Sequence, residues 1–143
     1  SNFIQSSLFI ITMLCVGFLE EIIFRGFLFK AMEKEGLKSA IIISSLTFGF
    51  GHIINLFTAH ANILATILQI CYATTTGFLF VIIFYKGKSL WPCIITHSVV
   101  NSLSVFRNSE NEAIWGNIAS AVFLCVVSLG YMAYILKATK ESR

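Results

Sequence analysis

Three charged side chains lie close together in the first hydrophobic stretch of the chain: Glu20, Glu21 and Arg25. Glu21 and Arg25 are four residues apart, so on a helix they share a face in the order that favours an ion pair. Glu20 lies about 100° further round such a helix and has no partner within its own segment. A carboxylate left unpaired in an apolar site takes up a proton readily, which suits a general base that acts on water.

A histidine ends a glycine-containing run in the second stretch, Phe48-Gly49-Phe50-Gly51-His52. Phe48 and His52 share a helix face, and the two glycines are expected to let another backbone come close. A lone histidine in a helix is more often a packed core residue than a catalyst. His52 therefore gains weight only from the other polar residues of the chain.

His97 and Asn101 repeat the four-residue spacing in the fourth stretch. An imidazole and an amide on one face could hydrogen-bond a single oxygen atom, or they could hold helices together. Depth favours a site. Depth can be counted from the flanking lysines at 1.5 Å per residue. By this count Glu20, His52, His97 and Asn101 all lie roughly 14–21 Å below the same membrane surface.

The charged residues of the first stretch could also serve only to fix helix packing. By some estimates an ionised side chain at a helix centre in a membrane costs about 2.5–3.5 kcal/mol, so three such charges are an expensive way to pack helices. We therefore favour a functional site. His60 lies outside the common layer, and we expect it in a loop.

The elements that must position these side chains are hydrophobic helices. The chain has 143 residues, of which 57% are hydrophobic and 12% charged, about half the roughly 25% charged residues of soluble domains. Five stretches approach the length that spans a membrane, although the fourth is short. They are Phe3–Phe29, Ala40–Phe57, Ile63–Tyr85, Leu90–Phe106 and Ala113–Leu136. We expect an all-α, multi-pass transmembrane helical bundle with the site inside it, forming one domain over residues 1–143.

The basic residues alternate between the connections. Eight of the ten Lys and Arg residues fall in the first connection, the third connection and the C-terminal tail. This pattern predicts an outside N-terminus and a cytoplasmic C-terminus. The net charge of +3 forms no basic patch, so we expect no nucleic-acid partner. The four cysteines lie far apart within apolar runs, which is not typical of a disulfide framework or of a CxxC metal site.

Taken in order, the motifs Glu-Glu-x-x-x-Arg, Phe-x-x-x-His and His-x-x-x-Asn on separate hydrophobic helices resemble the CPBP family of intramembrane proteases. That family includes type II CAAX prenyl proteases and bacterial proteins of bacteriocin processing or self-immunity. The resemblance covers residues 17–101. It implies an endopeptidase that cleaves a membrane-associated or lipidated peptide or protein, with Glu21, Arg25 and Phe48 supporting the catalytic residues.

The resemblance also implies the catalytic roles by position. Glu20 would activate the attacking water, and His52 would help to hold it. His97 and Asn101 would stabilise the oxyanion that forms at the peptide carbonyl. Members of the family have been called metalloproteases, and Glu20, His52 and His97 could bind a divalent metal such as zinc. The same three residues also suit a metal-free water activated by glutamate.

Two other functions fit the same residues. The fold could act as a non-catalytic scaffold that binds a membrane protein, or as a proton- or ion-coupled transporter, although the small number of helices argues against transport. The chain is rich in Ile, Phe and Lys and contains no Asp, which favours a bacterial plasma membrane. Full-length relatives usually have more helices and the chain begins at Ser1, so we expect an N-terminal truncation or a minimal variant.

Overall fold

The computed structural model describes residues 3–58, 62–104 and 114–141, and within these ranges every element is a helix. The predicted all-α bundle is therefore confirmed. In chain order the helical segments are α1 (Phe3–Glu21), the π-helix η1 (Ile22–Phe29), α2 (Lys30–Glu33), α3 (Leu37–Gly51), the 3₁₀-helix η2 (His52–Ile54), α4 (Asn55–Thr58), α5 (Ile63–Gly87), α6 (Trp91–Leu103) and α7 (Ile114–Glu141).

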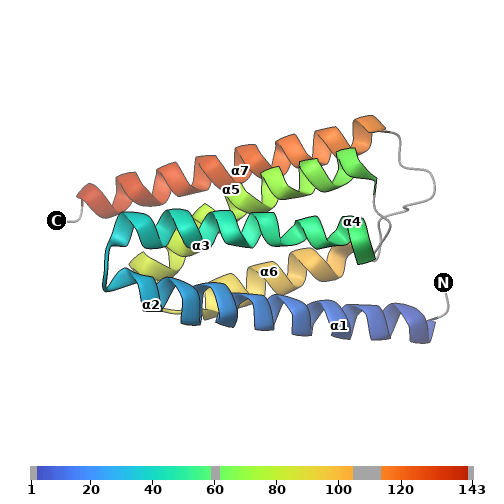
Figure 1. Ribbon diagram of the computed structural model, residues 1–143, viewed down its shortest axis with the longest axis horizontal. Coiled ribbons are helices and arrows are strands. Elements are labelled where there is room, and N and C mark those ends of the chain that lie inside the picture. Colours follow the sequence, from blue (N-terminus) through green and yellow to red (C-terminus); the bar gives the residue numbers. More distant parts are fainter. Residues whose placement is uncertain (1–2, 59–61, 105–113, 142–143) are drawn as a thin grey trace.

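The helices pack in a row of neighbours (Figure 1). The central helix α5 packs against α3 on one side and α7 on the other, whereas α6 packs mainly along α1. The π-helix η1 contacts both α3 and α5 and so joins the α1–α6 pair to the rest of the bundle. This arrangement brings the acidic residues at the end of α1 beside α6, where the second histidine lies.

Four of the helical rods are long and apolar enough to cross a membrane: Phe3–Glu33, Leu37–Phe57, Ile63–Gly87 and Ile114–Lys140. The helix α6 has 13 residues, which reach about 20 Å, less than the roughly 30 Å of a bilayer core. The fourth stretch is thus short, as predicted. The first membrane-spanning helix ends at Glu33 rather than at the predicted Phe29, and α3 begins at Leu37 rather than at Ala40. Only a short turn connects the two helices. The predicted ends at Phe106 and Ala113 lie outside the described residues.

Local signals set the ends of α5 and α6. The Asn62 side chain accepts a hydrogen bond from the Leu64 N–H at 2.8 Å and caps α5. At the other end Lys88 adopts a left-handed conformation with φ of 55°, and its N–H donates to the Phe84 carbonyl. Pro92 lies in the first turn of α6, where its missing N–H leaves no helical hydrogen bond unmade. The tight reversal between the helices returns the chain toward the middle of the bundle.

Two glycines allow close helix crossings. A Cβ atom at Gly17 would lie 2.8 Å from the Cα of Ser98, so α1 and α6 meet backbone to backbone there. A Cβ atom at Gly49 would lie 2.9 Å from the Thr74 nitrogen, so α3 and α5 also approach closely. The expectation that both glycines of the second stretch allow close approach is right for Gly49 and wrong for Gly51, which has nothing within 4 Å. Two residues span more than half a helical turn, so the two glycines face opposite ways.

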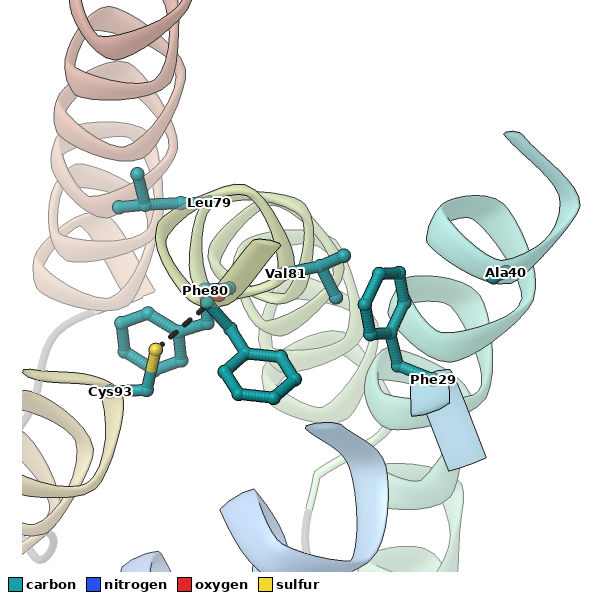
Figure 2. Packing of buried hydrophobic residues seen from close by; sticks show 7 residues of the cluster. Phe29, Ala40, Leu79, Phe80, Val81 and Cys93 are labelled. Carbon is teal, nitrogen blue, oxygen red and sulfur yellow. Dashed lines mark hydrogen bonds between the residues drawn. The ribbon is translucent and has the colours of Figure 1, made fainter. Parts of the chain in front are cut away.

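A cluster of buried apolar side chains lies beside the candidate site and joins η1, α3, α5 and α6 (Figure 2). Its members are Phe29, Ala40, Leu79, Phe80, Val81, Phe84 and Cys93. The Cys93 thiol donates to the Phe80 carbonyl at 3.3 Å, which ties the start of α6 to α5. This packing joins the segments that carry Arg25, Phe48 and His97.

Candidate active site

A π-helix begins directly after the two glutamates. Residues Ile22–Phe29 form its turns between α1 and α2, where we expected a uniform α-helix. Widened π turns are rare and frequently mark functional sites. The buried Ser44 hydroxyl of α3 donates to the Phe24 carbonyl of this segment at 2.9 Å. The irregular backbone is therefore held from a neighbouring helix.

The predicted ion pair between Glu21 and Arg25 is present. Arg25 Nη1 lies 2.9 Å from Glu21 Oε1, and both side chains are fully buried. The second guanidinium nitrogen of Arg25 donates to the Gly77 carbonyl of α5 at 3.2 Å. The Phe48 ring covers the guanidinium, with its centroid 4.3 Å from Cζ, a geometry that favours a cation over an aromatic face. Arg25 is thereby anchored to both α3 and α5.

His97 connects the two glutamates across 76 residues of sequence. Its Nδ1 atom lies 2.8 Å from Glu21 Oε1, and its Nε2 atom lies 3.3 Å from Glu20 Oε2. Glu20 has no partner within its own segment, as expected, but α6 supplies one. Because the ion-paired Glu21 carboxylate can only accept a hydrogen bond, Nδ1 of His97 carries a proton and Nε2 faces Glu20.

The cluster gathers two carboxylates, one guanidinium and one imidazole within 3.3 Å of one another along the chain of contacts from Arg25 to Glu20. Glu20 is the more accessible end of the pair, since 30% of its side chain is exposed and 8% of that of His97. Glu20 thus forms the accessible edge of the cluster.

Phe48 links the two histidines, although the four-residue spacing predicted only its contact with His52. Its ring meets His52 and His97 edge to face, with centroid distances of 5.5 Å in both cases. The His52 Nδ1 atom lies 3.0 Å from the Phe48 carbonyl. His52 stands where α3 passes into η2.

A cavity of about 180 Å³ lies on the other side of the histidines. His52, His97 and Asn101 line it, whereas Glu20 is not among its lining residues. The structure therefore brings the predicted site residues together in two groups. Glu20, Glu21 and Arg25 form the ionic group, His52 and Asn101 belong to the cavity, and His97 belongs to both.

The three possible metal ligands, Glu20, His52 and His97, do not converge in this arrangement. Both ring nitrogens of His97 face carboxylate oxygens. Within residues 3–58, 62–104 and 114–141, no three His, Cys, Asp or Glu side chains are grouped so that they could hold a metal ion. A site made of Glu20, His52 and His97 thus does not fit this geometry. His60 lies outside the described residues.

Sequence reasoning missed the contributions of α5. The Gly77 carbonyl binds Arg25, and the Phe80 ring lies 5.8 Å from that of His97. A backbone carbonyl and a buried phenylalanine are common in apolar helices and carry no distinctive signal. Only the packing of α5 against η1 and α6 reveals their role.

Two comparisons with known proteins found similar sequences. Residues 2–103 match a family model described as type II CAAX prenyl endopeptidase Rce1-like. Over 93 residues, which are 64% of this chain, the sequence is 33% identical to the "Putative membrane peptidase YdiL" of Bacillus subtilis (strain 168). The matched region is 33% of that protein, so the chain spans about a third of the length of this curated relative. No solved structure matches the chain significantly.

The matched residues run from α1 to the end of α6 and so include all the polar side chains described above. The helix α7 follows the matched region. Because the family model covers more than half of the chain, this integral membrane protein belongs to the Rce1-like family of type II CAAX prenyl endopeptidases, a group of the CPBP proteases whose motifs its sequence resembles.

Proposed function

We propose that this chain is an intramembrane endopeptidase that hydrolyses a peptide bond with a water molecule activated by Glu20. The observation that carries the proposal is the bridge from Glu20 through His97 to Glu21. It joins an accessible carboxylate to a buried one that Arg25 already neutralises. In many active sites a base is oriented by a second group that a third group holds in place. Here Glu20, His97 and Glu21 would take these three positions.

In the proposed reaction Glu20 withdraws a proton from water while the water oxygen attacks the carbonyl carbon. Protonated Glu20 no longer competes for the Nε2–H of His97, which then donates to the oxyanion while Nδ1 stays on Glu21. Asn101, one turn further along α6, supplies a second donor. Glu20 then passes its proton to the amide nitrogen as the carbon–nitrogen bond breaks. His52 helps to hold the attacking water, and no step uses a metal ion.

Glu21, Arg25 and Phe48 hold the His97 imidazole in position. Glu21 accepts a hydrogen bond from Nδ1 and so fixes the orientation of the ring. Arg25 offsets the charge of Glu21, and Phe48 packs against the guanidinium and both imidazoles. These residues contact other site side chains, so their substitution is expected to affect stability as well as rate.

The substrate in this proposal is a membrane-associated or lipidated peptide or protein. We also propose a bacterial plasma membrane with the C-terminus in the cytoplasm, and a role in bacteriocin maturation or self-immunity. The alternation of Lys and Arg supports the orientation, and the composition rich in Ile, Phe and Lys supports a bacterial source. The resemblance to CPBP proteins supports the role.

The deciding experiment compares membrane peptides from cells that express the wild type, Glu20→Gln or Glu33→Gln. Glu33 lies on the same helical rod but pairs with Lys30 at a distance of 3.8 Å, away from the histidines. We expect Glu20→Gln to lower the cleavage rate by a factor of about 10²–10⁴, and Glu33→Gln to leave the rate unchanged. Peptides that accumulate only with Glu20→Gln identify the substrate. Full cleavage by Glu20→Gln would overturn the proposal.

A non-catalytic scaffold is the second candidate, because the same contacts tie α1, η1, α3, α5 and α6 together. A scaffold needs Glu21 and Arg25, which are fully buried. It does not need Glu20, which is partly exposed and contacts His97 at only 3.3 Å. Function that survives Glu20→Gln but not Glu21→Gln therefore indicates a scaffold.

A further inference from the structure

A second cavity lies between α5 and α7, near the end of the bundle at which both helices begin (Figure 1). The two helices pack along each other. The cavity has a volume of about 150 Å³. Its lining consists of Ala65, Thr66, Leu68, Gln69 and Tyr72 from α5 and of Asn117, Ser120 and Leu124 from α7. We call this space the outer cavity, because the proposed topology puts the start of α5 outside.

Hydroxyl and amide groups follow the facing sides of these two helices. They belong to Thr66, Gln69, Tyr72 and Thr76 of α5 and to Asn117, Ser120 and Ser128 of α7. Their spacing keeps each set on roughly a third of the helix circumference. Further in, the two sets meet, because Thr76 and Ser128 share a hydrogen bond of 3.2 Å between their hydroxyl oxygens. Polar groups are costly inside a membrane, so such sets are satisfied either by each other or by water.

The hydroxyl of Thr66 indicates that side-chain bonds alone do not satisfy this interior. Thr66 is 1% exposed, and its Oγ1 atom has no hydrogen-bond partner in the described part of the chain. A buried hydroxyl without a partner costs free energy, which a bound water molecule would recover. A space of about 10–15 Å³ is large enough for one water molecule. The outer cavity therefore has both a polar anchor for water and room for several molecules.

The outer cavity adjoins the cavity beside the histidines. The residues that line both spaces are Gln69, Tyr72 and Leu124. Thr66 lines the outer cavity and Thr76 the inner one, so the two spaces together follow α5 over about 15 Å. At the other end Ser120 is exposed, and the outer cavity reaches the surface of the bundle there. A series of polar side chains therefore leads from this surface toward His52.

We infer that the outer cavity holds water and supplies it to the proposed reaction. Water enters near Ser120, binds the Thr66 hydroxyl and passes between α5 and α7 to the cavity in which His52 would hold the attacking molecule. The supply rests on the proposed endopeptidase function, whereas the hydration of the outer cavity does not. Since α7 lies beyond residues 2–103, this path is completed outside the region that matches the family model.

Matched variants of the full chain in nanodiscs test the hydration. Ala65→Leu fills the outer cavity, whereas Ala119→Leu makes the same change at an exposed position that does not line it. Hydroxyl radicals generated from water by X-rays oxidise the side chains that lie next to that water. We expect Ala65→Leu to remove the oxidation of Leu68, which lines the cavity, but not to change that of Ile67, which does not line it. Ala119→Leu should change neither. An unoxidised Leu68 in the wild type, or equal oxidation of Leu68 in Ala65→Leu, overturns the hydrated cavity.

Thr66→Val provides a second test that keeps the shape of the side chain. If water binds the hydroxyl, the change breaks a hydrogen bond, and the melting temperature should fall by about 2–4 °C. In a dry cavity the change removes a polar group without a partner, and the melting temperature should rise. Thr12→Val is the control, because the exposed Thr12 hydroxyl donates to the Leu8 carbonyl of its own helix at 2.8 Å. A melting temperature of Thr66→Val that equals or exceeds that of the wild type, after subtraction of the effect of Thr12→Val, overturns the bound water.

Cleavage of a fluorogenic peptide with one hydrophobic anchor separates this inference from the proposed function. We expect Ala65→Leu to lower kcat about tenfold, because the attacking water loses a hydrogen-bonded neighbour and such a bond has an effect of this size. Its KM should not change, and Ala119→Leu should change neither constant. A raised KM at an unchanged kcat assigns the cavity to the peptide and overturns the water path. Unchanged kcat and KM in Ala65→Leu overturn the supply alone. Oxidation of Leu68 that Ala65→Leu removes, without any cleavage by the wild type, overturns the peptidase proposal and supports the hydrated cavity.

Discussion

The Nδ1 atom of His97 lies 2.8 Å from the Oε1 atom of Glu21, and the same oxygen accepts from Arg25 at 2.9 Å. One carboxylate oxygen therefore receives two donors from different parts of the chain. This shared atom couples the buried ion pair to the imidazole that contacts Glu20. Changes in the ion pair should be transmitted to the proposed base even when Glu20 itself is intact.

Removing one partner of the buried pair should destabilise the protein strongly. Glu21→Gln leaves the Arg25 guanidinium buried without an opposite charge, which typically costs about 3–5 kcal/mol of unfolding free energy. The double variant Glu21→Gln with Arg25→Met should lose less than the sum of the two single changes. Denaturation in detergent measures all four proteins. Additive losses would contradict the coupling.

The exposed pair of Lys30 and Glu33 provides the control for this comparison of single and double variants. Its atoms are 3.8 Å apart and its side chains are 51% and 26% exposed. Water and salt screen such a pair, so we expect less than about 1 kcal/mol of coupling from the same kind of cycle.

Ser44→Ala should disturb the π-helix. Its hydroxyl binds the Phe24 carbonyl across helices, and the loss leaves a carbonyl without this donor, at a cost of about 1–3 kcal/mol. Because η1 joins Glu21 to the rest of the bundle, the cleavage rate should fall as well. Ser45→Ala is the matched control, since Ser45 is equally buried but binds Ile41 within its own helix. Equal losses in unfolding free energy and cleavage rate for the two serines would show that the cross-helix bond is unimportant.

Gly17→Ala should separate α1 from α6. The added carbon would lie 2.8 Å from the Ser98 backbone, so the helices must move apart and His97 must leave the glutamates. We expect a large loss of cleavage together with a lower melting temperature. Gly130→Ala on α7 has nothing within 4 Å and should be neutral, or stabilising by up to about 1 kcal/mol. Wild-type activity in Gly17→Ala would contradict the close crossing.

The orientation in the membrane can be tested by thiol labelling from one side. Serine first replaces Cys15 and Cys71, the two exposed cysteines of the described region. One new cysteine is then placed at Lys34 or at Asn62. The predicted topology puts position 62 outside and position 34 inside. A membrane-impermeant reagent added to intact cells should therefore label Asn62→Cys and spare Lys34→Cys. The reverse pattern would invert the proposed topology.

Much of the fold follows from local patterns in the sequence. Hydrophobic runs set the helices, and a spacing of four residues sets which side chains share a face. The Glu21–Arg25 pair and the contact of Phe48 with His52 are of this kind, and both are present. The π-helix at Ile22–Phe29 was not predicted, because its residues are ordinary for an α-helix and the Ser44 bond that holds it comes from α3.

The amino-acid sequence by itself determined that the chain is a helical membrane protein, and it predicted that the polar residues lie at one depth, because hydropathy and helical rise are properties of each segment alone. The tertiary structure alone decided that His97 joins Glu20 to Glu21, that the three possible metal ligands do not converge, and that α7 lines a cavity beside the histidines. These features depend on how helices rotate and pack against one another. That packing is set by glycine crossings and side-chain volumes distributed over the whole chain.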